Sequence, residues 1–407
     1  MKKIFIFIVL LTNFLVANVL QEAIDNAKEG AILKLSAGIY EGNIIINKPI
    51  SIIGKEAGVI IKGEGEGTVV QILSSYVTFK NLTVTNSGSR HDLLDTGILI
   101  KEVKHVEVSN NRVVDCLFGI DMQQVSNSIV THNFVQSKDT ELGLRGDGLR
   151  VWYSNDNIVS NNELYKSRDM VVWYSHGNLI ENNKGTFGRY SLHFMHAGKN
   201  IVRGNYYEMN SVGIFFMFSR DSIIENNTVK SSLGTTGMGI GLKEVDDFVI
   251  RNNTIIYNAR GFYIDRSPYE PGSSNLMEGN NILYNTEAMR FHSTNINNQI
   301  LTNKFLGNIE DVVNDTPGSK THENNFEGNY WDNYEGFDKD ENGIGDTPHK
   351  VYQYADKLWL YNPSLKYFYG SPVISLLNFL AKLAPFSEPM FILEDSKPRI
   401  ASNDRKK

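Results

Sequence analysis

The hydrophobic positions of this chain follow a short phrase that recurs over its central two thirds. Each copy alternates aliphatic or β-branched residues with polar ones around an asparagine, as in VSNNRV, VSNNEL, IENNTV and IRNNTI. Alternation with a period of two is typical of strands and not of helices. The recurring asparagines are Asn111, Asn133, Asn162, Asn183, Asn205, Asn227, Asn253, Asn280, Asn303 and Asn324.

The spacing of these asparagines indicates the architecture. The shortest interval, from Asn162 to Asn183, suits one coil of three short strands and three turns, and insertions in the turns lengthen other coils. We therefore predict an all-β chain folded as a right-handed parallel β-helix. Asparagine tolerates the left-handed backbone of a sharp turn, and its stacked amides are expected to form a hydrogen-bonded ladder.

The repeat divides the chain into four predicted regions. Residues 1–17 read as a signal peptide, because Lys2 and Lys3 precede a short apolar run. Residues 18–327 form the β-helix, which opens with an amphipathic helix that covers its end. Residues 328–395 form an aromatic and acidic loop region followed by a short capping or docking helix, and residues 396–407 a polar, disordered tail.

Charge and cysteine content exclude two classes of protein. Loss of Lys2 and Lys3 with the signal peptide changes the formal net charge from -6 to -8, so nucleic acid is an unsuitable partner. Cys116 is the only cysteine, so no disulfide can form within the chain. Stability must therefore come from a hydrophobic core.

Alignment of one strand from each coil predicts which residues face outward. In segments such as GLRVW, MVVWY, SLHFM and GIFFM the second and fourth residues are apolar and are assigned to the core, which places Val171 and Trp173 inside. The outward positions are polar at both ends of the stack and apolar in the middle. Such a patch is normally covered by a partner, a ligand or a loop of the same chain, here Ser137–Asp147. The predicted partner-binding residues are Arg150, Trp152, Tyr153, Tyr174, Phe215 and Phe218.

The same patch contains soft potential metal ligands. Met195 and Met217 are expected to stack, with His193 beside them and His196 just past the strand end. Thioethers and imidazoles together favour Cu(I), so these four residues form a predicted copper site. The alternative is that the methionines fill gaps under a covering loop and that His193 is an ordinary wall residue.

Two other kinds of site are less well supported by the sequence. The segment Asp338 to Asp346 alternates oxygen ligands like a calcium loop, but His349 stands where an EF-hand needs glutamate, so calcium is not expected there. Charged residues on the outward face, such as Asp121 and Arg290, lie at opposite ends, which gives no paired carboxylates for acid and base catalysis. Polysaccharide binding or modification remains the alternative function.

Two C-terminal segments then point to a family. With the signal peptide and the coils, GNYWDNYEGFDKDENGIGDTPH and SPVISLLNFLAKLAPFSEP resemble the NosD family of periplasmic maturation proteins. The resemblance implies that the chain is not an enzyme but the periplasmic component of an ABC transporter, working with a permease and an ATPase. It also implies a role in assembling the copper-sulfide centre of nitrous oxide reductase, together with a copper chaperone.

The resemblance gives the C-terminal helix an expected task, which is docking to the permease at the membrane. The helix is too short to cross a bilayer, and five aliphatic residues fall on one face. These docking residues are Val373, Leu376, Leu377, Leu380 and Leu383. The resemblance carries no catalytic motif onto numbered positions of this chain.

Overall fold

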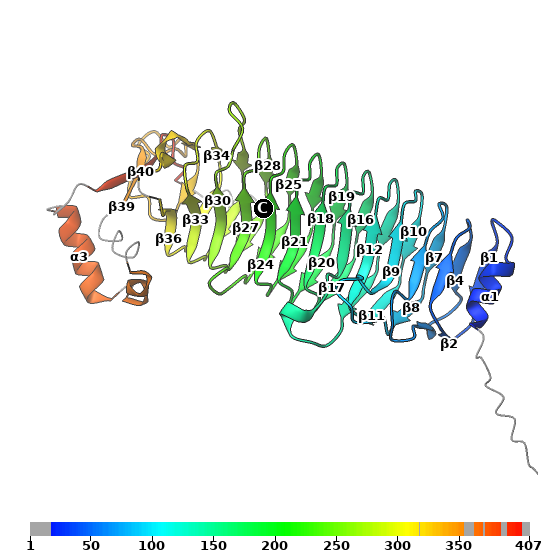
Figure 1. Cartoon of the computed structure of the whole chain (residues 1–407). Helices are drawn as coiled ribbons and strands as arrows, with labels where there is room; N and C mark the ends of the chain where they lie inside the picture. Colours follow the sequence, from blue (N-terminus) through cyan, green and yellow to red (C-terminus); the bar gives the residue numbers. More distant parts are fainter. Residues whose placement is uncertain (1–17, 317, 354–361, 369–370, 384–388, 401–407) are drawn as a thin grey trace, which may run out of the picture.

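A computed structural model describes residues 18–400 except 317, 354–361, 369–370 and 384–388, so the predicted signal peptide lies outside the described residues. The chain winds into a long stack of coils whose strands form three sheets, here called A, B and C (Figure 1). Within the stack of coils, a strand pairs in parallel with the third strand after it, as in β21 with β24, because each coil contributes one strand to each sheet. Strand β39 instead joins sheet A by antiparallel pairing with β40. The right-handed parallel β-helix is confirmed.

The strand bounds follow the order of each sheet. Sheet A contains β1 (Ile32–Leu35), β4 (Ser51–Gly54), β7 (Thr78–Lys80), β10 (Glu107–Ser109), β13 (Ile129–Thr131), β16 (Ile158–Ser160), β19 (Leu179–Glu181), β22 (Ile201–Arg203), β25 (Ile223–Glu225), β28 (Val249–Arg251), β31 (Leu276–Glu278), β34 (Gln299–Leu301), β37 (Asn325–Glu327), β40 (Met390–Asp395) and β39 (His349–Gln353). Sheet B contains β2 (Gly38–Glu41), β5 (Val59–Lys62), β8 (Thr83–Thr85), β11 (Arg112–Cys116), β14 (Phe134–Ser137), β17 (Glu163–Tyr165), β20 (Lys184–Thr186), β23 (Tyr206–Glu208), β26 (Thr228–Lys230), β29 (Thr254–Ile256), β32 (Asn281–Leu283), β35 (Lys304–Leu306) and β38 (Tyr330–Trp331). Sheet C contains β3 (Ile44–Ile46), β6 (Val70–Ile72), β9 (Thr96–Lys101), β12 (Phe118–Gln123), β15 (Leu149–Trp152), β18 (Asp169–Trp173), β21 (Tyr190–Met195), β24 (Val212–Met217), β27 (Met238–Lys243), β30 (Arg260–Asp265), β33 (Glu287–His292) and β36 (Glu310–Asn314).

A buried asparagine ladder runs along the corner between sheets A and B. The side-chain amide of Asn162, for example, donates to the Oδ1 atom of Asn183 at 3.0 Å, and its own Oδ1 accepts from Asn133 at 3.0 Å. The ladder ends at Asn329, whereas the predicted last member, Asn324, belongs to a second ladder with Asn298. The left-handed residue is also not the ladder asparagine but the one before it, such as Asn161.

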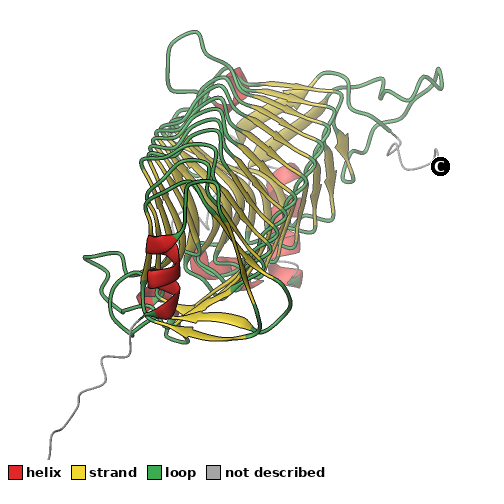
Figure 2. Ribbon diagram, turned by 90° about the vertical axis from the view of Figure 1, so that its right-hand side faces the viewer, coloured by secondary structure: helices red, strands yellow, loops and turns green. Residues whose placement is uncertain are grey.

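Both ends of the stack are closed, though not entirely as predicted. Helix α1 (Val19–Asn26) lies across the first coils, as Figure 2 shows from that end. Its side chains Leu20 and Ile24 are buried. At the other end, strands β38 and β40 extend the sheets beyond residue 327, the predicted limit of the β-helix. Asp395 terminates the ladder, because its Oδ2 accepts from Asn329 Nδ2 at 2.9 Å.

The other helices in the described residues are short and peripheral. They are η1 (Leu142–Leu144), η2 (Thr321–Glu323), η3 (Pro363–Phe368) and α3 (Pro372–Leu383), which stands away from the coils in Figure 1. The expected disorder of the tail is wrong for its first residues, because Arg399 bridges to Tyr330 and Ile344. The backbone of Arg399 donates to the carbonyl of Asn329 at 2.9 Å, which holds this segment on the last coil.

Candidate functional site

The middle of the outer face of sheet C is built from strands β15, β18, β21 and β24. Pairing of Leu149 with Met170 and of Val151 with Val172 puts those side chains in the core. Trp173 therefore faces outward, and the predicted inward position of Val171 and Trp173 is wrong. Because side chains alternate strictly, a shift of one residue transfers the whole set to the opposite face.

This register brings three of the four predicted metal ligands together. His193 lies on β21, and its Nε2 atom is 3.4 Å from the sulfur of Met217 on β24. Met195 is the register partner of Met217, so the two thioethers occupy neighbouring positions of one outward column. Both methionines are partly exposed, whereas His193 is 9% exposed. The three side chains form a cluster of soft donors at the boundary between protein and solvent, here called the soft-donor cluster.

Aromatic rings determine the state of the His193 imidazole. Tyr190 stacks on it with ring centroids 4.8 Å apart, and Trp173 meets it at 5.7 Å with an interplanar angle of 89°. Burial lowers the pKa of His193 to about 4, so the ring is neutral at pH 7. A neutral imidazole has a free lone pair on one nitrogen, and nitrogen with thioether sulfur suits Cu(I).

His196 is not part of this cluster. It occupies the left-handed turn after β21, and its ring lies between Tyr174 at 5.2 Å and Phe218 at 5.0 Å. Tyr153 stacks on Tyr174 at 4.8 Å and completes a column of four rings, here called the aromatic ladder. Tyr153, His196 and Phe218 are exposed. The ladder follows the edge of sheet C and presents ring edges to solvent, because neighbouring rings cover each other's faces.

Two predicted partner residues are mostly covered by the protein itself. Arg150 is 9% exposed and lies between two carboxylates, with its Nη1 3.3 Å from Asp121 and its Nε 3.6 Å from Asp147. Phe215 is also 9% exposed, and its ring lies over Gly241, where a Cβ atom would come within 2.1 Å of it. Trp152 and the exposed rings of the aromatic ladder remain available to a partner.

A chain of alternating acids and bases borders the soft-donor cluster. Arg168 Nε donates to Asp147 Oδ1 at 2.9 Å, and Arg189 pairs with Asp169. Arg189 also lies over the ring of Tyr190 at 5.1 Å, which connects the chain to the partner ring of His193. Burial outweighs the two arginines and raises the pKa of Asp147 to about 6. Asp121 is fully buried, and its pKa is raised for the same reason, above all by desolvation.

The inserted loop Ser137–Asp147 makes its described contacts away from the aromatic ladder. The carbonyl of Leu144 is 3.0 Å from His91 Nε2, and Arg145 Nη1 donates to the carbonyl of Phe187 at 3.2 Å. Phe187 precedes β21, whereas the ladder follows the ends of the sheet C strands. These contacts do not support the alternative in which the loop covers the aromatic patch.

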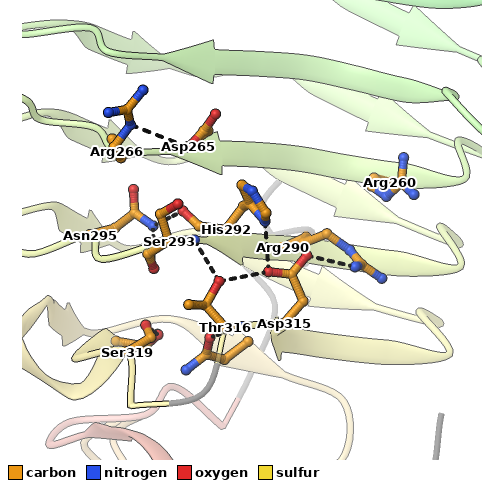
Figure 3. A network of polar contacts seen from close by, with 12 residues as sticks. Arg260, Asp265, Arg266, Arg290, His292, Ser293, Asn295, Asp315, Thr316 and Ser319 are labelled. Atoms are coloured by element: carbon orange, nitrogen blue, oxygen red, sulfur yellow. Dashed lines mark hydrogen bonds and ion pairs between the residues drawn. The ribbon is translucent and has the colours of Figure 1, made fainter. Parts of the chain in front are cut away.

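A second polar cluster occupies the C-terminal end of the same face (Figure 3). Asp315 is its centre, because it accepts from Arg290 Nη1 at 2.9 Å and from Thr316 Oγ1 at 3.1 Å, and lies 2.9 Å from His292 Nδ1. Arg290 also pairs with Glu287, which lies 3.6 Å from Arg260. We call this set the end cluster, and its groups are largely committed to one another.

Helix α3 leaves its predicted docking residues uncovered. Val373 and Leu383 are each 67% exposed, and Leu376, Leu377 and Leu380 are exposed as well. In the described part of the chain, no helix is long and apolar enough to cross a membrane.

The acidic loop from Asp338 to Asp346 is organised by its own backbone. Asp338 accepts from the amide of Gly343 at 2.7 Å, and Asn342 accepts from the amide of Ile344 at 2.8 Å. Among the described residues, no group of three or more His, Cys, Asp or Glu side chains is arranged to hold a metal ion. The soft-donor cluster is of a different kind, since methionine supplies most of it.

Sequence reasoning missed two residues of the site. Trp173 was assigned to the core, because every position of MVVWY is apolar and the register cannot be read locally. Tyr190 precedes the aligned strand segment, so the alternation of the strand does not select it, although it stacks on His193. A signal was present for Trp173, since Trp152 occupies the outward position one coil earlier.

Fold and site together define a class, a parallel β-helix with a buried asparagine ladder and a soft, aromatic zone on one outer face. The family model described as periplasmic copper-binding protein (NosD) matches residues 133–336, and a right-handed β-helix model matches residues 18–164. The chain belongs to the NosD family and is a NosD-type periplasmic protein.

Full-length relatives agree with this assignment. The chain is 26% identical to a probable ABC transporter binding protein NosD of Pseudomonas aeruginosa, covering 90% of this chain and 89% of that one. It is 27% identical to the protein of the same name from Stutzerimonas stutzeri, with 90% and 86% covered. These relatives carry the name of a binding protein and not of an enzyme.

A solved structure shows the same fold in a different context. The A-module of a mannuronan C-5 epimerase from Azotobacter vinelandii superposes with a TM-score of 0.60 at 15% identity. The match covers 74% of this chain and 92% of the module. At this level of identity the likeness establishes the fold alone.

Proposed function

We propose that this protein is the periplasmic component of an ABC transporter and serves the maturation of nitrous oxide reductase by docking partners and handling Cu(I) as cargo. The observation that carries the proposal is the 3.4 Å approach of His193 Nε2 to Met217 sulfur, with Met195 in register beside it. Family membership supports the periplasmic setting and the transporter association.

The aromatic ladder supplies the docking surface in this proposal. It lies one residue beyond the soft-donor cluster, so a copper chaperone or the reductase bound on Tyr153, Tyr174 and Phe218 would meet the cluster directly. Polysaccharide binding is less favoured, because the ring faces inside the ladder, which would stack on sugars, are occupied by neighbouring rings. The ladder edges and Trp152 suit a protein surface, where tyrosine and tryptophan are common anchors.

Cu(I) titration against a chromophoric chelator tests the copper step. The double variant Met195→Ala, Met217→Ala is expected to weaken Cu(I) binding about tenfold or more, because two of the three soft donors are lost. Met209→Ala is the matched control, since Met209 is 52% exposed on another face of the coil. Equal affinity of the double variant and the control would rule out the proposed ligands and leave the docking role to be tested separately.

Helix α3 has the second docking role, toward the permease. Leu376→Ser with Leu380→Ser is expected to abolish co-purification with the permease and ATPase in detergent, because two exposed aliphatic contacts become polar. Leu233→Ser is the control, since Leu233 is 61% exposed on a coil turn. Retention of the complex by the α3 variant, at the level of the control, would refute this assignment.

A further inference from the structure

Trp173 stands at the soft-donor cluster without a structural role that explains its indole. Its register partners are Trp152 on one side and Met195 on the other, and Met195 pairs in turn with Met217. The four side chains form one outward column along the axis of the stack. Trp173 is therefore the neighbour of the thioethers, and its ring also meets the His193 imidazole at 5.7 Å.

The indole nitrogen of Trp173 is buried and has no hydrogen-bond partner. A buried donor without a partner is unfavourable, and a leucine or phenylalanine would fill this outward position without it. His193 Nδ1 is in the same condition on the neighbouring coil. Two unsatisfied nitrogens around one group of thioethers indicate that the position is occupied for a reason other than packing.

Trp152 is a natural comparison within the same column. Its ring packs edge-on against Tyr153 at 4.7 Å and 90°, which makes it part of the aromatic ladder side of the face. No ring contact joins Trp152 to His193 among the described residues. The two tryptophans share strand position and chemistry, and they differ in whether they contact the soft-donor cluster.

We propose that Trp173 is a further ligand-shell residue, whose indole ring lies against the Cu(I) held by His193, Met195 and Met217 and attracts it through a cation–π interaction. The inference rests on the proposed copper function and identifies the fourth side of the site. Tryptophan is the best aromatic partner for a cation within about 6 Å of its ring centroid. The attraction is strongest for a weakly hydrated cation in a partly desolvated position.

The donor set, with the ring as one part of it, would also determine which metal ions the site selects. Zn²⁺ and Cu(II) need nitrogen, oxygen or thiolate donors, and the described residues place no group of His, Cys, Asp or Glu at the cluster. Thioethers, one imidazole and an aromatic face hold a soft monovalent ion, for which Ag(I) is a redox-inert probe. We expect the protein to bind Cu(I) and Ag(I) and to ignore Zn²⁺ at the same concentration.

Paired tryptophan variants of the full chain test this inference. Trp173→Leu is expected to weaken Ag(I) and Cu(I) binding about tenfold, Trp173→Phe less, and Trp152→Leu not at all. Ag(I) should also change the tryptophan emission of the wild type and of Trp152→Phe, and leave that of Trp173→Phe unchanged. Emission is a direct readout of an ion at the indole, which a purely structural role of Trp173 would not produce.

The outcomes separate this inference from the function it rests on. In one outcome, the double variant Met195→Ala, Met217→Ala weakens binding, whereas Trp173→Leu binds like Trp152→Leu and the Ag(I) emission change persists in Trp173→Phe. The indole is then not in the ligand shell, and the copper function stands. If the methionine variant binds normally, the copper function itself fails. Circular dichroism of Trp173→Phe shows whether the fold is intact, so a loss in Trp173→Leu can be attributed correctly.

Discussion

The middle of the outer face of sheet C and its C-terminal end use the same strand positions, yet their polar atoms are satisfied to different degrees. Around the middle, Asp121 Oδ1, Arg150 Nε, Trp173 Nε1 and His193 Nδ1 are buried without a hydrogen bond. In the end cluster, as far as the chain is described, Arg260 Nε is the one such atom; it lies 3.6 Å from Glu287, just as Arg150 Nε in the middle lies 3.6 Å from Asp147.

The difference shows which region is structural. Asp315 is shared by Arg290, His292 and Thr316 and so joins two neighbouring coils, and the pair of Glu287 with Arg260 connects a third (Figure 3). The middle leaves donors and acceptors unused, which lowers stability and is typical of a region kept for binding. Substitutions at the end are therefore expected to affect stability, and substitutions in the middle to affect ligand binding more than stability.

Arg290→Ala is expected to give the largest loss of stability. The arginine is 17% exposed and lies between Glu287 and Asp315, so its removal leaves partly buried carboxylates facing each other. A loss of about 3 kcal/mol is typical when one partner of such a pair is removed. Urea unfolding followed by circular dichroism measures it.

The control for this prediction is an exposed ion pair on sheet A. Arg251 is 45% exposed and pairs with Glu225, so Arg251→Ala should change the free energy of unfolding by less than about 1 kcal/mol. Equal effects of the two substitutions would show that the end cluster is not a structural clamp.

Asp147 gives a pH-dependent test of the middle. Its pKa of about 6 is above the usual value, so between pH 4 and pH 6 the folded chain binds a proton that the unfolded chain does not. The contribution of Asp147 to stability therefore grows as the pH falls through this window. Relative to Asp147→Asn, the wild type should gain about 2 kcal/mol between pH 7 and pH 4, measured by urea unfolding.

An exposed acid provides the comparison of sign. Arg90 lowers the pKa of Asp92 by a side-chain hydrogen bond, so acid weakens this contribution. The stability of the wild type relative to Asp92→Asn should therefore not rise as the pH falls. If the difference in free energy of unfolding between wild type and Asp147→Asn does not change with pH, the arginines compensate the Asp147 charge fully. The middle would then be as well satisfied as the end cluster.

The architecture could be predicted from the sequence, because the same pattern recurs in each coil along most of the chain. One ladder asparagine per coil and alternating aliphatic residues specify strands, turns and stacking together. The last coil escaped this reasoning, because β40 and Asp395 return to it from far along the chain. A pattern with a fixed period carries no information about a partner more than 60 residues away.

The candidate site was only partly readable, for reasons of register and burial. The outward column placed His193, Met195 and Met217 correctly, but His196 lies one residue farther on a left-handed turn and joins the aromatic ladder instead. Arg150 and Phe215 do face outward, yet neighbouring side chains cover them. The face toward which a side chain points follows from its position in the alternation of the strand. Its exposure depends on the side chains of the adjacent coils.

His193→Phe is the smallest expected effect and the sharpest test of the comparison, because it should stabilise the protein. The substitution removes a buried imidazole with an unpaired Nδ1 and keeps an aromatic ring between Tyr190 and Trp173. The expected gain is about 1 kcal/mol at pH 7.5, observed as a rise of roughly 2 °C in Tm. His193 has its pKa lowered to about 4, so the unfolded chain alone binds a proton between pH 6.5 and pH 4, and wild-type stability falls there. The gain should therefore increase at pH 5.

His292→Phe is the matched control at the end cluster, where loss of the 2.9 Å contact with Asp315 should lower Tm. If both substitutions lower Tm, the middle is as well satisfied as the end, and unused polar atoms do not mark the binding region of this face.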